Sequence, residues 1–211
     1  METILLVGRL ATHLSHDGIN KTDKANMEII LMRHGKPGFT DTKKVAAHEM
    51  PVWIKHYDLS DISDNQPPEA CRIIASRARM TVSSHLPRAI SSGITLNLEP
   101  EIVDDIFREA ELPIYPVPIL RLSPFSWIMI FRLIWLCGMS KEAESLSMAK
   151  KRARRATDIL INYAQKHDGP ILLMGHGIMN RLIAKELISL GWKEHTRAGK
   201  GYWSAGIFQL S

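Results

Sequence analysis

Cysteine is scarce in this sequence, and its placement excludes several classes of protein. Only two cysteines occur in 211 residues, Cys71 and Cys137, and they lie far apart in apolar surroundings. Disulfide-stapled secreted domains and zinc knuckles need more cysteines, at closer spacings. We therefore expect a protein of a reducing compartment, without a disulfide framework.

Long hydrophobic runs are also missing. No basic segment precedes the apolar run Ile4–Val7, which is itself too short for the core of a signal peptide. The other apolar stretch, Trp127–Cys137, is interrupted by Arg132 and falls well short of the ~20 residues that a membrane span requires. The sequence thus predicts a cytoplasmic protein with no stable membrane insertion.

What the chain does contain is ordinary for one globular domain with a sizeable core: 45% hydrophobic and 23% charged residues, with no internal repeat. The net charge of +5 favours anionic ligands in general, but it does not choose among nucleic acid, phospholipid and a small phosphate ester. Residues 1–26 turn polar and lose periodicity, so we expect a poorly ordered extension there and a single domain over residues 27–211. A translation start at Met27 would remove the extension.

Strands and helices alternate along that domain. The alternation predicts an α/β fold with three layers, in which a mainly parallel central sheet carries helices on both faces. Ser140 is expected to cap a long helix that reaches residue 168. The expected strands are 28–31, 80–84, 102–107, 171–174 and 203–210, and the expected helices are 47–57, 67–78, 87–98, 123–137, 140–168 and 178–190.

Two of the expected buried strands end in the same way. One leads into Arg33-His34-Gly35 and another into Gly175-His176-Gly177, while a third is followed by Arg88 at the start of a helix. Because the carboxyl ends of parallel strands share one edge of a sheet, these side chains can meet although they are distant in sequence. Two histidines, two arginines and a helix amino terminus suit a dianionic phosphoryl group.

The same residues resemble a known family. Leu31–Gly35 is similar to the Arg-His-Gly signature of the histidine phosphatase superfamily, which includes the cofactor-dependent phosphoglycerate mutases. Ser83–Ala89 resembles the family's second motif, Gly175–Gly177 its third, and Arg108-Glu109 the segment that carries its acid. Glu144-Ser145 also resembles a family feature. The parts follow one another in family order, and the resemblance implies a phosphoglycerate mutase-like fold and the phosphatase branch of the superfamily.

The resemblance further implies a metal-independent phosphomonoesterase that uses no cofactor. His34 would accept the phosphoryl group as a phosphohistidine, with its other ring nitrogen donating to a backbone carbonyl. Glu109 would protonate the leaving alcohol, and Glu111 is the alternative acid. The catalytic set implied is His34, Glu109, His176, Arg33 and Arg88.

The substrate is expected to be a small phosphorylated metabolite. Mutases of the family follow Arg-His-Gly with a polar segment containing serine and asparagine, whereas this chain has Lys36-Pro37-Gly38-Phe39, which favours a hydrolase. A phosphomutase of the same chemistry and a non-catalytic phospholigand-binding protein remain alternatives. The substrate-binding residues expected are Arg33, Arg88, Gly177, Lys36 and Asn180, with Arg181 beside Asn180.

Several other features have plainer interpretations. The basic run Lys150–Arg155 is interpreted as a solvated helix face and not as a nucleic-acid site. The apolar helix 124–137 lies in an expected insertion at about 113–139; we rank it first as a lid or pocket wall, second as a homodimer surface and third as a membrane-contacting surface. His85 is expected in a pocket wall or loop. The remaining histidines, expected on the surface, are His13, His16, His48, His56, His167 and His195.

Overall fold

A six-stranded sheet forms the centre of the computed structural model, which describes residues 27–210; the extension expected over 1–26 lies outside the described residues. The strand order is β4-β3-β6-β1-β8-β7. Strands β1, β6, β3 and β4 run parallel, β8 is antiparallel to β1, and β7 is antiparallel to β8. The mainly parallel sheet is thus confirmed. The strands are β1 (Glu28–Arg33), β3 (Met80–Ser84), β4 (Ile102–Asp104), β6 (Ile171–Gly175), β7 (Trp192–Thr196) and β8 (Ala205–Leu210).

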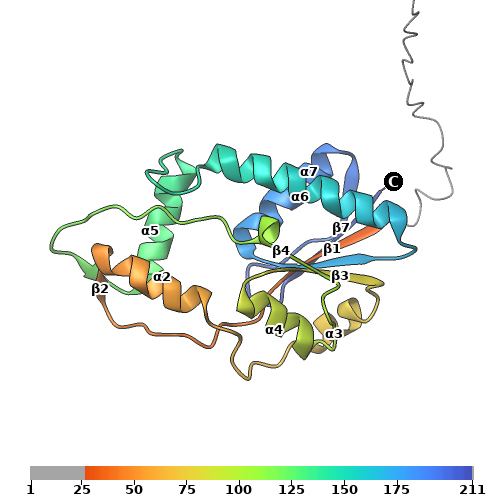
Figure 1. Cartoon of the computed structure of the whole chain (residues 1–211), viewed down its shortest axis with the longest axis horizontal. Helices are drawn as coiled ribbons and strands as arrows, with labels where there is room; N and C mark the ends of the chain where they lie inside the picture. Colours follow the sequence, from red (N-terminus) through yellow and green to blue (C-terminus); the bar gives the residue numbers. More distant parts are fainter. Residues whose placement is uncertain (1–26, 211) are drawn as a thin grey trace, which may run out of the picture.

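Helices cover both faces of this sheet, which confirms the three layers. In Figure 1, α6 and α7 lie over one face, and α3 and α4 lie under the other. Strand β1 shows why: Ile29 and Leu31 belong to the core cluster that includes residues of α6 and α7, whereas Ile30 and Met32 belong to the cluster that includes residues of α3 and α4. A strand buried on both faces reads as the continuous apolar run seen in the sequence. The helices are α3 (Glu69–Ala75), α4 (Pro87–Thr95), α6 (Leu146–Lys166) and α7 (Gly177–Ser189).

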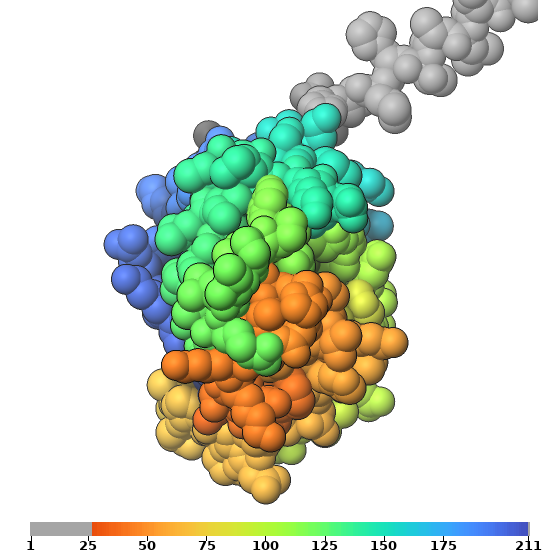
Figure 2. Space-filling view, turned by 90° about the vertical axis from the view of Figure 1, so that its left-hand side faces the viewer, coloured from red at the N-terminus to blue at the C-terminus, as the bar shows by residue number. Residues whose placement is uncertain are grey.

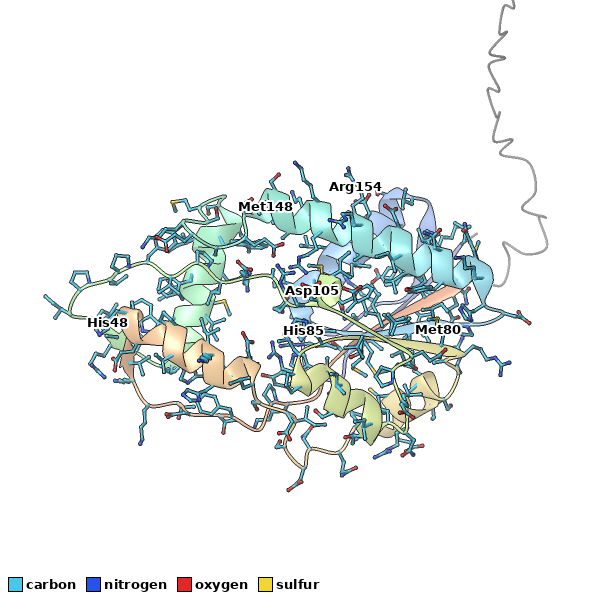
Figure 3. The ribbon with its side chains drawn as sticks, viewed as in Figure 1. His48, Met80, His85, Asp105, Met148 and Arg154 are labelled. Atoms are coloured by element: carbon cyan, nitrogen blue, oxygen red, sulfur yellow. The ribbon has the colours of Figure 1, made fainter. Side chains whose placement is uncertain are left out.

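A second group of elements lies beyond the carboxyl ends of the parallel strands. It contains α2 (Met50–Asp58), α5 (Pro124–Leu136) and a two-stranded sheet of β2 (Val45–Ala46) and β5 (Arg121–Leu122). Figure 3 shows the direction: Met80 marks the start of β3, and His85, just after its end, lies toward α2 and α5. The group has its own apolar cluster, in which Trp127 and Phe131 of α5 pack with residues of α2. None of the helices within residues 27–210 combines the length and apolarity that crossing a bilayer requires.

The ends of several elements differ from the sequence prediction. Ser145, and not Ser140, caps α6: its hydroxyl accepts a hydrogen bond from the Met148 N–H at 3.1 Å. The strand expected over 102–107 stops at Asp104, because the Asp104 carboxylate accepts from the Ile106 N–H and starts the 3-10 helix η2 (Asp105–Phe107). A second 3-10 helix, η1 (Ala47–Glu49), leads into α2.

Strands β2, β5 and β7 were not predicted. β7 is an edge strand in which four of five residues are exposed, so its sequence carries no apolar alternation that could announce it. β2 and β5 have two residues each, too few for any periodicity.

Candidate active site

The two histidines that end matching strands lie side by side. Strands β1 and β6 are in register, with Arg33 opposite Gly175, and the His34 N–H donates to the Gly175 carbonyl at 3.1 Å. The ring centroids of His34 and His176 are 5.0 Å apart. Arg88 follows β3 in the first turn of α4, and its charge acts on both rings. The predicted meeting of the three residues at one edge of the sheet is therefore confirmed.

His34 is held in one tautomer. Its Nδ1 lies 2.7 Å from the Gly35 carbonyl oxygen, which can only accept, so Nδ1 carries the proton and Nε2 keeps a lone pair. The backbone turns sharply here against Trp203: a Cβ on Gly35 would overlap the Trp203 indole. Burial first, and then the proximity of the His176 ring and the positive charges of Arg88 and Arg33, lower the pKa of His34 well below its usual range. The imidazole is thus neutral at physiological pH.

His176 lies fully buried behind it. Burial, followed by the charges of Arg88 and Arg33, lowers the pKa of His176 well below its usual range. Neither ring nitrogen has a hydrogen-bond partner among the described residues. A neutral imidazole has one N–H donor and one acceptor. In the part of the chain that the structure describes, both ring nitrogens of His176 are among the few buried polar atoms without a partner.

Arg33 and Arg88 are each stacked on a tyrosine. The Arg33 guanidinium lies 4.5 Å from the centre of the Tyr202 ring and donates from Nη1 to the Lys200 carbonyl at 2.9 Å. The Arg88 guanidinium lies 5.0 Å from the Tyr57 ring centre. In each arginine Nε is buried without a partner within residues 27–210. The stacked rings fix the guanidinium planes while leaving one donor of each uncommitted.

The nearly inaccessible side chain of Arg88 is paired with Asp58, whose Oδ1 lies 3.0 Å from Arg88 Nη1. Burial, and after it the neighbouring Tyr202, raises the pKa of Tyr57 above its usual range, so this phenol adds no negative charge. Tyr57, Asp58 and Tyr202 were not predicted from the sequence. They come from the end of α2 and from the loop before β8, and no spacing in the sequence links them to the arginines.

The Glu109 side chain lies at the amino terminus of α7, the helix that begins directly after His176. Its carboxylate accepts hydrogen bonds from the N–H groups of Ala110 at 3.0 Å, Ile178 at 3.1 Å and Met179 at 3.0 Å. This is a favourable position for an anion, because helix amino termini present free N–H groups and a positive dipole end. Glu111 is held elsewhere: its Oε2 accepts from the Glu144 N–H at 2.8 Å.

A buried ion pair fixes the segment that carries Glu109. Arg152 makes a two-pronged contact with Glu144, at 2.8 and 2.6 Å, and donates to the carbonyls of Ile106 and Arg108 at 2.8 Å each. The interpretation of 150–155 as a solvated face is therefore wrong at Arg152, whose side chain is only 11% exposed. The other end of the segment is held from α5, where Arg132 donates to the carbonyls of Ala110 and Glu111 at 2.9 and 3.1 Å.

A cavity of about 920 Å³ opens over these residues. Its polar floor includes Arg33, His34, Arg88, Glu109 and Gly177, and His85 also lines it, as predicted. Its walls come from α2, the segment after Glu109, and α5, so the helix 124–137 is a pocket wall, as the first-ranked interpretation held. Figure 2 shows this end of the molecule, where α2 (orange), the segment before α5 (light green) and α5 (green) meet at the surface.

Lys36 and Asn180, two of the five expected binding residues, are not among those that line the cavity. Lys36 is exposed, and its carbonyl accepts from the Ser63 N–H at 3.1 Å. Asn180 faces the sheet, where its amide donates to the Met32 carbonyl at 3.1 Å. Arg33, Arg88, Gly177 and the neighbouring Arg181 do line the cavity.

The other predictions concern residues away from the cavity floor. His48, His56, His167 and His195 are exposed, as predicted, whereas His13 and His16 lie outside the described residues. Within residues 27–210 no three or more His, Cys, Asp or Glu side chains are grouped so as to hold a metal ion.

Comparisons with known proteins bear on the fold. No protein-family model and no curated protein matches the chain. Solved structures do. The product of the open reading frame Rv3214 of Mycobacterium tuberculosis is 15% identical with a TM-score of 0.59, over 88% of this chain and 96% of that one.

Two further solved structures have the same architecture. A mycobacterial glucosyl-3-phosphoglycerate phosphatase is 18% identical with a TM-score of 0.51, over 78% and 83% of the two chains. A phosphoglycerate mutase from Bacillus anthracis is 18% identical with a TM-score of 0.53, over 90% and 91%. At these identities the likeness establishes the fold alone, which is phosphoglycerate mutase-like, as the sequence motifs implied.

Proposed function

We propose that this protein is a metal-independent phosphomonoesterase that works through a phosphohistidine on a small phosphorylated substrate. The observation that carries the proposal is a set of buried nitrogen atoms without partners in the described chain, which surrounds His34: Nε of Arg33, Nε of Arg88 and the ring of His176. Leaving a buried polar group unsatisfied costs about 1–3 kcal/mol, so such groups mark ligand sites when they converge. Three non-bridging phosphoryl oxygens would accept from the two Nε–H groups and from the single N–H of the neutral His176 ring.

The first step transfers the phosphoryl group to His34. The Nε2 lone pair attacks phosphorus as the bond from phosphorus to the ester oxygen breaks, and Glu109 in its acid form gives its proton to that oxygen. The hydrogen bond from Nδ1 to the Gly35 carbonyl stabilises the positive charge that develops on the ring. Arg33 and Arg88 balance the charge on the transferred group.

The second step returns the enzyme to its starting state. Water gives a proton to the Glu109 carboxylate and attacks phosphorus, the bond from nitrogen to phosphorus breaks, and inorganic phosphate leaves. We assign this role to Glu109 in preference to Glu111, because Glu109 contacts the N–H of Ile178, two residues after His176, whereas Glu111 is tied to the Glu144 backbone and to Arg108.

Hydrolysis of p-nitrophenyl phosphate in excess chelator tests the proposal. The wild-type protein should turn over, and His34→Ala should lose at least about 10³-fold in kcat/KM, because removing a nucleophile removes the whole covalent route. His195→Ala is the matched control, since that histidine is exposed on β7 and should leave the rate unchanged. Full activity in His34→Ala would refute the nucleophile.

Rapid quenching with a labelled phosphate ester distinguishes the alternatives. A phosphohistidine should appear within one turnover, be labile to acid and stable to base, and decay to inorganic phosphate. Label transferred to another alcohol of the substrate would instead support a mutase, and stoichiometric binding with no turnover would support a phospholigand-binding protein.

A further inference from the structure

We infer that the preferred substrates are phosphomonoesters whose alcohol part is an extended apolar chain or ring system. The inference rests on the proposed function, because it names the substrate class of the same site. Helix α5 is apolar over most of its surface, with Ser126 and Arg132 as its polar residues. One face of this helix packs inward through Trp127, Phe131 and Trp135, which are all fully buried.

A second face of α5 is apolar but exposed, and it faces the cavity. Met129, Leu133 and Leu136 are 63%, 56% and 50% exposed, and all three line the cavity. A helix that is apolar all round is normally buried on all sides, and contiguous exposed apolar surface on a soluble domain marks a binding site. Four of the five α5 residues that line the cavity are apolar, and Arg132 is the exception.

The opposite walls have the same character. From α2 the cavity is lined by Trp53, Ile54 and Tyr57, and from the segment after Glu109 by Leu112 and Ile114. The apolar surface therefore continues around the cavity above the phosphoryl-binding floor.

The charged groups nearest the apolar wall of α5 are committed to protein partners. Arg132 donates to the carbonyls of Ala110 and Glu111, and Arg108 lies 3.5 Å from the Glu111 carboxylate. A sugar or amino-acid phosphate needs hydrogen-bond partners along its alcohol part, and this wall has few to give. The exposed charges of Lys141, Glu142 and Arg181 also line the cavity and remain in contact with water.

The size of the cavity agrees with a long alcohol part. Pockets for drug-sized ligands measure roughly 300–1,000 Å³, and this one measures about 920 Å³. A phosphoryl group at His34 fills a small part of it, and whatever is esterified to that group extends between α5 and α2.

The test measures kcat/KM for ethyl, butyl, hexyl and octyl phosphate as dissolved monomers, through release of inorganic phosphate. Burying a methylene group contributes about fourfold, so kcat/KM should rise by roughly that factor per methylene until the wall is covered. Using dissolved monomers separates contact with the cavity wall from adsorption to a membrane surface.

Variants at the wall identify where the gain arises. The double variant Met129→Gln, Leu133→Gln should reduce the gain to below twofold per methylene. Met148→Gln is the matched control, because Met148 is 59% exposed and does not line the cavity. Figure 3 labels this residue on α6. Leu136→Gln alone should lower the slope by a smaller amount, and it provides a second variant if the double one folds poorly.

The outcomes separate the two proposals. If the wild type hydrolyses every ester at a flat or falling kcat/KM, or if the rise with chain length survives in the double variant, the apolar substrate class is overturned while the phosphatase stands. If no ester is hydrolysed, or His34→Ala hydrolyses them as well as the wild type does, the proposed function itself has failed.

Discussion

Replacing Arg152 with methionine would test how the segment that carries Glu109 is held. Methionine keeps the apolar stem and removes the guanidinium. The change deletes the two-pronged contact with Glu144, at 2.8 and 2.6 Å, and two hydrogen bonds to the carbonyls of Ile106 and Arg108.

The magnitude follows from what would remain in the variant. The Glu144 side chain is only 6% exposed. Burial acts to raise the pKa of this carboxyl, but the hydrogen bonds and charge of Arg152 outweigh it, so the pKa of Glu144 lies below its usual value. Removing one partner of a buried pair costs about 3–5 kcal/mol, because the other charge stays uncompensated. We expect Arg152→Met to lose about 4 kcal/mol of unfolding free energy, a large part of the roughly 5–15 kcal/mol typical of a domain.

Urea unfolding followed by tryptophan fluorescence measures this loss. Arg155→Met is the matched control on the same helix, and because Arg155 is exposed it should change stability by less than about 0.5 kcal/mol. The double variant Arg152→Met, Glu144→Met should recover much of the loss, since no buried charge is left without a partner. A loss below about 1 kcal/mol in Arg152→Met would refute the reasoning. In the folded fraction kcat should fall more than KM rises, because Arg152 positions the acid and does not touch the phosphoryl floor.

Three further predictions concern the floor of the site. Tyr202→Leu removes the aromatic ring on which the Arg33 guanidinium is stacked. The inhibition constant of inorganic phosphate should therefore rise about 2- to 30-fold, as expected for the loss of a cation–π contact of roughly 0.5–2 kcal/mol. In the control Tyr202→Phe, which keeps the ring, the inhibition constant should stay within about twofold of the wild-type value. Gly175→Ala should destabilise the protein by about 1–3 kcal/mol in the same urea assay, because the new Cβ would overlap the amide oxygen of Asn180, and an unchanged midpoint would contradict this packing. The pKa of His176 is lowered in the folded state, so as the pH falls below about 6.5 His176 becomes protonated in the unfolded chain but not in the folded one. The unfolding free energy must therefore decline until the pH reaches the lowered pKa of the folded state. Unfolding free energy measured from pH 7 to 5 should therefore fall by up to about 1.4 kcal/mol per pH unit more steeply in the wild type than in His176→Gln, and parallel curves would refute the assignment.

The part of the site that could be predicted from sequence is the part built by strand ends. His34, His176 and Arg88 each follow a buried strand, and the geometry of a parallel sheet alone brings such residues to one edge. The apolar runs, the flanking glycines and the proline that opens α4 are all local signals, so no knowledge of distant contacts was needed.

What could not be predicted depends on contacts between distant segments. Arg152 is one of several basic residues on α6, and only the folded chain shows that it faces Glu144 and the carbonyl of Ile106. The same contact explains the misplaced start of α6. Glu144 falls inside the helix predicted to start at Ser140, but it is buried against Arg152, and the helix begins after Ser145.

Arg132 connects the cavity wall formed by α5 to the segment that carries Glu109. Arg132 lies on the cavity face of α5 among apolar neighbours. It donates hydrogen bonds to the carbonyls of Ala110 and Glu111, the two residues that directly follow Glu109. Burial lowers the pKa of Arg132 relative to an exposed guanidinium, although the nearby carboxylates act in the opposite direction. Because α5 and the acid segment share these hydrogen bonds, an apolar alcohol part that packs on α5 also stabilises the position of Glu109. Binding energy from a non-reacting part of the substrate then contributes to the chemical step. We therefore expect longer esters to have a higher kcat as well as a lower KM. Arg132→Met should abolish the rise in kcat with chain length while leaving the fall in KM.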